Sequence, residues 1–311
     1  MSNSLWKKQG LVFSPPNYFS SPTSNSFAIA PTPIVFKNSQ SVRVFYTTLS
    51  SSNEGFVYWV DFDINNPGVV VNYSTQPVLN PGFSGFFDGN GVMATSVIET
   101  KLNQLYMYYV GFELLRNIPY RLLVGLAFSL DGGNSFEKYS TQPILERTIS
   151  EPFFRGSPLV RHHNGKYQMW YVGGGSWLYD SQRLSPQYSL KYMESQDGIS
   201  WPNDSTLILN PSEDGYAIGR PWIDFQIHPP LLYYSERKLN ILKYRIQNRI
   251  LVNKNEIGNQ LSEYSLQAGP EKYDEDEICY AAVVDLPKYK ALYYNGNNKG
   301  EFGIALATIK K

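Results

Sequence analysis

Aromatic strand-like segments that recur at a nearly constant spacing constrain this chain more than any other feature. The central copy, Lys166–Tyr171, reads KYQMWY, and related segments occur along the whole sequence. Their last tyrosines lie 60 to 63 residues apart and are Tyr46, Tyr109, Tyr171, Tyr234 and Tyr294. A fixed period indicates a repeat architecture in which each repeat is one supersecondary unit.

Each repeat contains four strand-like segments. In the repeat around Tyr171, the aromatic segment is preceded by Ser157–Val160 and followed by Leu190–Ser195, which ends at the turn-forming pair Asp197-Gly198. The fourth segments of two repeats nearly coincide, as YSTQPVL at 73–79 and YSTQPIL at 139–145. Four short antiparallel strands per repeat, five times over, predict an all-β fold, a five-bladed β-propeller.

The predicted blades divide the chain into one domain spanning 1–311. Their approximate ranges are 27–79, 88–145, 155–210, 217–266 and 277–309. The last range supplies only three strands, so we expect residues 4–13 to add the fourth and close the ring. Closure removes the exposed edges of an open sheet.

Composition limits the classes of partner. The formal net charge is zero and no basic run occurs, so neither nucleic acid nor a membrane surface is expected as a partner. No apolar run reaches the roughly 18 residues of a membrane span, and no export signal begins the chain, which favours a cytoplasmic protein. The single cysteine, Cys279, excludes an internal disulfide framework. No metal-ligand spacing occurs, so no metal or cofactor is expected, and the sequence does not predict an oligomeric state.

Three acids precede the first strands of different repeats and form the predicted catalytic set. They are Asp88, Glu213 and Glu277. Because first strands surround the axis of a propeller, these carboxylates are expected on one face. Converging acids suit glycosidic chemistry, in which one protonates the leaving oxygen and another activates water or attacks. The alternative is that they pair with nearby arginines and only stabilise the fold.

The same face receives a predicted substrate-binding set. Arg155 and Arg220 lie at the starts of first strands, where their guanidinium groups match a phosphate or carboxylate of the substrate. Trp177 is a candidate platform for stacking on a sugar ring. Loops between second and third strands add Tyr179, Arg237 and Asn295. Internal ion pairing of the two arginines is the alternative.

Several motifs carry a resemblance to a known superfamily. They are FFDGNGV at 86–92, GLAFSLDGG at 125–133, YQMWY at 167–171 and YYNGN at 293–297. Together they resemble the five-bladed propeller glycosidases, namely glycoside hydrolase families 43, 32 and 130 and related propellers of polysaccharide gene clusters. The resemblance covers nearly the whole chain and implies acids at the starts of first strands, where Asp88 and Glu277 match by position.

One departure from that pattern bears on activity. Family 43 hydrolases carry an Asp early in the first blade, whereas this chain reads NSFAIA at 25–30. The resemblance then leaves a phosphorylase, a transferase or a propeller without catalysis. We therefore expect a carbohydrate-active enzyme that cleaves or transfers at a glycosidic bond of an anionic or phosphate-activated sugar, with a sugar or nucleotide sugar as its partner. The alternative is a non-catalytic carbohydrate-binding or assembly propeller.

Overall fold

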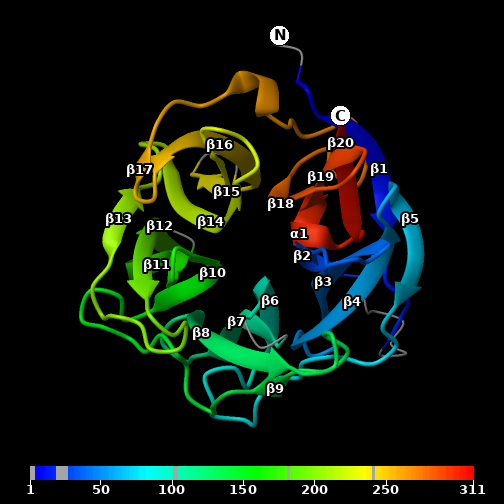
Figure 1. Cartoon of the computed structure of the whole chain (residues 1–311). Coiled ribbons are helices and arrows are strands. Elements are labelled where there is room, and N and C mark those ends of the chain that lie inside the picture. Colours follow the sequence, from blue (N-terminus) through cyan, green and yellow to red (C-terminus); the bar gives the residue numbers. More distant parts are fainter. Residues whose placement is uncertain (1–3, 19–26, 101–103, 181–182, 240–241) are drawn as a thin grey trace.

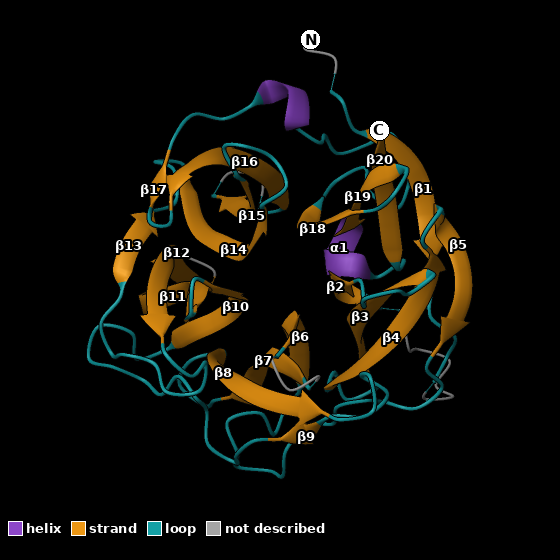
Figure 2. Ribbon diagram, in the orientation of Figure 1, coloured by secondary structure: helices purple, strands orange, loops and turns teal. Residues whose placement is uncertain are grey.

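The computed structural model describes residues 4–18, 27–100, 104–180, 183–239 and 242–311. In this part of the chain the strands form three sheets of four, twelve and four strands (Figures 1 and 2). Two short parallel contacts, β8 with β10 and β12 with β14, divide the twelve-stranded sheet into three antiparallel groups of four, which gives five such groups in all. Group 1 contains β2 (Ile29–Ile34), β3 (Ser41–Leu49), β4 (Gly55–Asp63) and β5 (Asn66–Tyr73). Group 2 contains β6 (Val92–Glu99), β7 (Leu105–Leu114), β8 (Tyr120–Ser129) and β9 (Glu137–Lys138). Group 3 contains β10 (Phe154–His163), β11 (Lys166–Asp180), β12 (Arg183–Ser195) and β13 (Thr206–Leu209).

Group 4 contains β14 (Gly215–Asp224), β15 (Leu231–Lys238), β16 (Tyr244–Asn253) and β17 (Glu256–Ile257). Group 5 contains β18 (Cys279–Asp285), β19 (Tyr289–Asn295), β20 (Ile304–Lys310) and, from the other end of the sequence, β1 (Lys7–Phe13). A 3₁₀ turn, Ser262–Tyr264, and the short helix α1, Asn297–Gly300, complete the described elements. The expectation of an all-β fold is confirmed. No helix among the described residues is long and apolar enough to span a membrane.

The groups surround a common centre, with the first strand of each group innermost (Figure 1). At one end of the molecule, the third strand of a group or the segment next to it bonds to the start of the next group's first strand. The linked pairs are Gly55 with Gly91, Leu122 with Phe154, Tyr188 with Ala217, Tyr244 with Ile278, and Gly300 with Ala28. These backbone links hold the starts of the inner strands in fixed positions around the centre.

Every inner strand carries a bulge at the same place in its ladder. The register with the second strand shifts after Ile29, Ala94, Gly156, Gly219 and Cys279. In four of the five strands the next residue has a positive φ, namely Ala30, Ser157, Arg220 and Tyr280. Three of these are followed by Pro, which has no N–H to donate and therefore suits a bulge position without a ladder partner. Pro31, Pro158 and Pro221 thus lie at the bulges of three inner strands.

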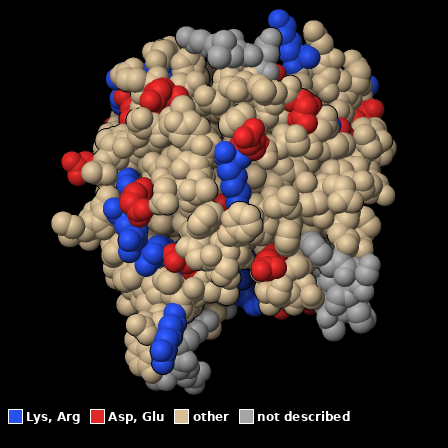
Figure 3. All heavy atoms as spheres, turned by 90° about the horizontal axis from the view of Figure 1, so that it is seen from below, with Lys and Arg blue, Asp and Glu red and all other residues tan. Residues whose placement is uncertain are grey.

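The second strands form the packed interior. All five recurrent tyrosines lie in them and are buried. Apolar clusters cross from one group to the next; for example, Phe45 of β3 packs with Val97 of β6 and Met107 of β7. On the outer face drawn in Figure 3, acidic and basic side chains are interspersed over a largely uncharged surface. The tyrosine period therefore marks the layer where neighbouring groups pack together.

Candidate functional site

The carboxylate of Asp88 lies in a buried polar network. It is 1% exposed and sits in the turn that leads into β6. Its Oδ2 accepts a hydrogen bond from the Tyr109 hydroxyl at 2.9 Å and lies 2.6 Å from the ammonium Nζ of Lys138. The acid therefore joins the second strand of group 2 to its outermost strand, β9.

The same arrangement occurs in two other groups. In group 3, the Tyr171 hydroxyl donates to Glu151, whose carboxylate also lies 2.8 Å from Lys191 and 2.8 Å from Arg155. In group 5 the Tyr294 hydroxyl donates to Asp274, and Lys8 of β1 pairs with the same oxygen at 2.6 Å. We call these three sets the acid–tyrosine–lysine pins. In each, a lysine pairs with a buried carboxylate and a recurrent tyrosine donates a hydrogen bond to it; Glu151 also pairs with Arg155.

Two of the predicted substrate-binding arginines are held by internal contacts. Arg155 pairs with Glu151 and donates to the carbonyl oxygen of Glu146. Arg220 is 1% exposed and lies between inner strands, where it donates to the carbonyl oxygens of Tyr280 and Pro31 and to the Thr32 hydroxyl. Burial lowers the pKa of Arg220 to about 9. Among the described residues, no carboxylate pairs with Arg220.

Three further predicted residues lie apart from one another. Asn295 is buried, and its amide links β19 to group 1 through the backbone of Ala28 and Ala30. Glu213 is exposed in the turn before β14, and Tyr179 is 76% exposed near the end of β11. The residues Asn25 and Ser26, where the sequence departs from the family pattern, lie outside the described residues.

A cluster of tyrosines occupies the centre of the molecule at the starts of the inner and third strands. We call it the axial cluster; it consists of Tyr120, Tyr188, Tyr216, Tyr244 and Tyr280, with Arg237 among them. The hydroxyls of Tyr188 and Tyr244 lie 3.4 Å apart, and the rings of Tyr244 and Tyr280 are 5.6 Å apart. Trp177 packs against Tyr120 and Phe154 at the edge of this cluster.

Arg237 is the cation at the heart of the axial cluster. It comes from β15, and its guanidinium carbon lies 4.2 Å from the centre of the Tyr244 ring. Its Nε is buried and has no hydrogen-bond partner among the residues that the structure describes. Within the described part of the chain no carboxylate lies within ion-pair distance of this guanidinium. Because an arginine remains protonated, a half-buried positive charge lies here without a direct ion pair to any described residue.

A second cation, Lys299 of α1, lies close enough to Arg237 for the two positive charges to repel each other. Burial lowers the pKa of Lys299, and repulsion by Arg237 lowers it further, while Glu277 acts in the opposite direction. The side chain of Glu277 is buried, and its two oxygens accept the backbone N–H groups of Tyr244 and Lys299. Glu277 is therefore the predicted acid that the structure places beside cations and tyrosines, next to the start of β18.

Other chemistry at the axial cluster is limited. Cys279 is fully buried, and burial raises the pKa of its thiol well above the ordinary value, which favours an unreactive thiol. Among the described residues, no three His, Cys, Asp or Glu side chains are grouped as metal ligands. The groups available for chemistry here are tyrosine hydroxyls, two cations and one carboxylate.

The structure thus brings together some of the predicted catalytic and substrate-binding residues but not all of them. Glu277, Arg237 and Trp177 lie at or beside the axial cluster, while no contact among the described residues joins Asp88, Glu213 and Glu277. Their assignment as a catalytic set remains a prediction. Lys299 and the axial tyrosines were not predicted. The sequence feature that could have indicated the axial tyrosines is a tyrosine at or near the start of third strands, as at Tyr120, Tyr188 and Tyr244.

The fold resembles solved structures of glycoside hydrolases. One, described simply as a glycoside hydrolase, has a TM-score of 0.71 at 17% identity, covering 98% of this chain and 91% of that one. A second is from work on the GH130 family of mannoside phosphorylases, which contains glycoside hydrolases that target beta-1,2 mannosidic linkages in Candida mannan. Its TM-score is 0.69 at 14% identity, covering 97% of this chain and 93% of that one. The Bombyx mori GH32 beta-fructofuranosidase BmSUC1 has a TM-score of 0.62 at 15% identity, with 98% of this chain matching 62% of that one. The predicted resemblance to propeller glycosidases is confirmed at the level of fold.

Comparison of sequences adds one relative found in two strains. The uncharacterized protein Rv1502 of Mycobacterium tuberculosis is 25% identical over 306 residues, which cover 98% of this chain and 99% of that protein. Its counterpart MT1551 from another strain of the same species matches to the same extent. No family model matches the chain.

Proposed function

We propose that this protein is a carbohydrate-active enzyme that cleaves or transfers at a glycosidic bond of an anionic or phosphate-bearing sugar, bound at the axial cluster. We also infer that the five strand groups are the blades of a propeller that β1 completes. The observation that carries the function is the Arg237 guanidinium, which is half-buried among tyrosines and whose buried Nε has no hydrogen-bond partner among the described residues. A partly desolvated charge without an ion-pair partner is costly, and an anionic ligand would offset that cost.

The surroundings of Arg237 support an anion rather than a neutral ligand alone. Guanidinium groups bind phosphate and carboxylate oxygens through paired N–H donors. Lys299 adds a second positive charge that is coupled to the first. The hydroxyls of Tyr188 and Tyr244 offer further donors to the same anion. Trp177 at the edge of the cluster supplies an aromatic face for the sugar ring.

Glu277 is our candidate for the acid–base group. It is the predicted acid whose backbone partners, Tyr244 and Lys299, belong to the proposed binding site. One carboxylate beside two cations suits attack by inorganic phosphate, with the cations holding phosphate and the carboxylic acid protonating the leaving oxygen. This is the scheme that the resemblance to family 130 implies. Phosphorolysis is therefore the form of the reaction that we favour.

The test is time-resolved proton NMR of the purified protein with oligosaccharides, aryl glycosides and nucleotide sugars, each with and without inorganic phosphate. We expect new anomeric signals that require phosphate and disappear in Glu277→Gln and Arg237→Gln. Arg147→Gln is the matched control, because Arg147 is an exposed arginine paired with its neighbour Glu146. Turnover that persists in both site variants would overturn the assignment.

A non-catalytic binding protein is the second candidate. It is favoured by the fact that both oxygens of Glu277 accept backbone N–H groups and that Asp88 is held in a pin. In that case a sugar phosphate would bind to the wild type and not to Arg237→Gln, and no new anomeric signal would form. Isothermal titration of the same panel separates this outcome from turnover.

A further inference from the structure

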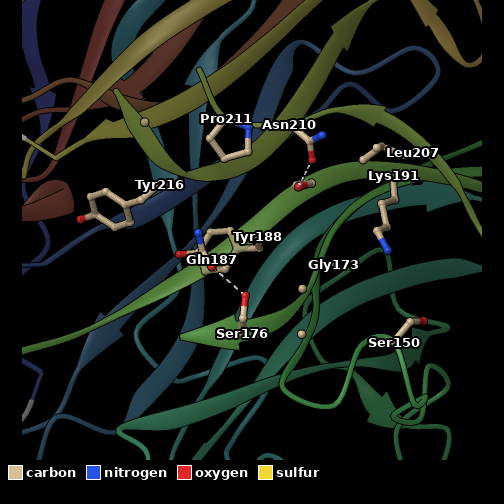
Figure 4. A pocket seen from close by; sticks show the side chains of 14 residues that line it. Ser150, Gly173, Ser176, Gln187, Tyr188, Lys191, Leu207, Asn210, Pro211 and Tyr216 are labelled. Atoms are coloured by element: carbon tan, nitrogen blue, oxygen red, sulfur yellow. Dashed lines mark hydrogen bonds between the residues drawn. The ribbon is translucent and has the colours of Figure 1, made fainter. Parts of the chain in front are cut away.

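A hollow of about 490 Å³ lies between groups 3 and 4, next to the axial cluster. Its floor is formed by β11 and β12, and its outer wall by Leu207, Asn210 and Pro211. Tyr188 and Tyr216 of the axial cluster line it, and Figure 4 shows Tyr216 at one side and Lys191 at the other. Its volume lies within the usual range of small-ligand pockets, roughly 300–1,000 Å³.

Three consecutive glycines, Gly173–Gly175, line the floor of the hollow. A Cβ on Gly174 would lie 2.1 Å from the carbonyl oxygen of Gln187, and one on Gly175 would lie 2.6 Å from that of Ser150. A Cβ on Gly173 would collide with the Glu151 carboxylate. The register of β11 and β12 also shifts between Gly173 and Ser176. The three glycines therefore allow close packing of β11 against Glu151, Gln187 and Ser150, and they also line the hollow.

The polar side chains around the hollow are arranged in two pairs. The Ser176 hydroxyl donates to Oε1 of Gln187 at 2.8 Å, and the Ser189 hydroxyl donates to Oδ1 of Asn210 at 2.7 Å (Figure 4). Each pair fixes the carbonyl end of an amide, which leaves the amide NH₂ to donate elsewhere. Within the described part of the chain, neither NH₂ group has a hydrogen-bond partner.

Most polar side chains around the hollow are uncharged serines and amides. Lys191 is the cation among the described lining residues, and it shares the Glu151 carboxylate with Arg155, each at 2.8 Å. Amide donors and hydroxyls match the hydroxyl groups of a neutral sugar, which both accept and donate hydrogen bonds. The axial cluster differs in its lining, because there the Arg237 guanidinium has no ion-pair partner among the described residues.

We propose that this hollow binds a neutral hexose unit of the substrate, while the anionic or phosphate-bearing part lies at Arg237. The substrate class is then an oligosaccharide that runs outward from the centre between groups 3 and 4. Tyr188 and Tyr216, which belong to both sites, would contact the junction between the two parts. The idea that one substrate occupies both sites rests on the proposed function, whereas the binding of a neutral sugar in the hollow does not.

The test uses ¹⁵N-labelled full-length protein and NMR titrations with two separate probes. The first is a panel of methyl glycosides of glucose, galactose, mannose and rhamnose in both anomeric forms; the second is inorganic phosphate. We expect at least one glycoside to shift the side-chain NH₂ signals of Gln187 and Asn210 and the amide signals of residues 173–175. Phosphate should shift the Arg237 side-chain signal and leave those of the hollow unchanged.

Two variants of Asn210 sharpen the result. Asn210→Asp keeps the shape but removes the NH₂ donor, and we expect roughly tenfold weaker glycoside binding, the effect of one lost hydrogen bond. Asn210→Phe should abolish it by filling the hollow. Asn72→Phe, an exposed position in β5, is the control for adding an aromatic ring.

The outcomes separate the two proposals. Phosphate shifts at Arg237 with no glycoside shift at the hollow would overturn this inference and leave the anion site standing. Glycoside shifts that survive in Asn210→Phe would also overturn it. Glycoside shifts at the hollow without any phosphate effect would support the neutral sugar site and overturn the anionic part of the proposed function.

Discussion

Lys138 reaches from the outermost strand of group 2 to place its ammonium nitrogen 2.6 Å from the buried carboxylate of Asp88. Asp88 precedes a first strand, and this ion pair gives it a role in stabilising the fold. Glu151 and Asp274 are held in the same way in other groups. The pins therefore connect the start of an inner strand to more distant parts of its group.

Removing the acid of a pin should mainly destabilise the protein. Asp88→Asn leaves Lys138 without its partner, and we expect a loss of about 3 kcal/mol in the free energy of unfolding, measured by urea denaturation. Glu146→Gln, which removes an acid from an exposed pair with Arg147, is the control and should cost at most about 1 kcal/mol. A fully stable Asp88→Asn protein that has lost turnover would instead favour the catalytic prediction for Asp88.

The hydroxyl of a recurrent tyrosine should contribute measurably on its own. Tyr171→Phe removes the donor to Glu151 but keeps the ring, so we expect a loss of about 1.5–3 kcal/mol, as for a hydrogen bond to a charged group. Tyr179→Phe, at a 76% exposed position, should stay within about 0.5 kcal/mol of the wild type. Equal stabilities of the two variants would contradict the role of the pin.

Arg220 should act on stability rather than on ligand binding. Arg220→Met deprives two carbonyl oxygens and the Thr32 hydroxyl of their donor, so we expect a loss of about 3 kcal/mol or more in thermal or urea unfolding. Arg147→Met is the exposed control. If the folded Arg220→Met protein lost phosphate binding while Arg237→Gln retained it, the anion site would lie at Arg220 instead.

Glu194 should make the fold sensitive to acid. Hydrogen bonds from Lys254 and Tyr192 lower the pKa of Glu194 from 4.5 to about 2. Between these values the unfolded chain binds a proton that the folded chain does not, so the stability contributed by Glu194 is present above pH 4.5 and declines as the pH falls toward 2. We expect the difference in unfolding free energy between wild type and Glu194→Gln to shrink over this range. A constant difference would contradict the shift.

Lys299 should give anion binding a dependence on alkaline pH. Its pKa is lowered by burial and by Arg237, so its positive charge is lost below the ordinary value of 10.5. Phosphate affinity, measured calorimetrically, should therefore fall as the pH rises from neutral toward 10.5. Lys299→Met should bind more weakly at neutral pH and lack this decline. An unchanged decline in the variant would assign the titration to another group.

The fold could be read from the sequence because its signals are local and repeated. The tyrosine period located all five second strands, and Asp131 and Asp197 both lie in the turns that follow third strands. The sequence did not show that the hydroxyls of those tyrosines bind acids. The residues of one pin can be far apart in the sequence, as Lys8 is from Asp274.

The site was harder to predict because position along the sequence does not determine where a side chain points. Asp88 and Glu277 both precede first strands, yet one pairs with Tyr109 and the other accepts backbone N–H groups beside Lys299. Arg220 sits at a bulge with φ of 31°, a conformation that sequence spacing does not reveal. Lys299 lies in the four-residue helix α1, where no sequence pattern singles it out.

The pairing of β1 with β20 has a mechanical consequence. Lys7 faces Thr308, so the outer ends of the two strands lie side by side, and tension applied across them would load the ladder one residue pair at a time from that end. Such unzipping requires less force than shearing all the hydrogen bonds at once. We therefore expect the seam between β1 and β20 to open first under load, releasing Lys8 from Asp274 before any other group begins to separate.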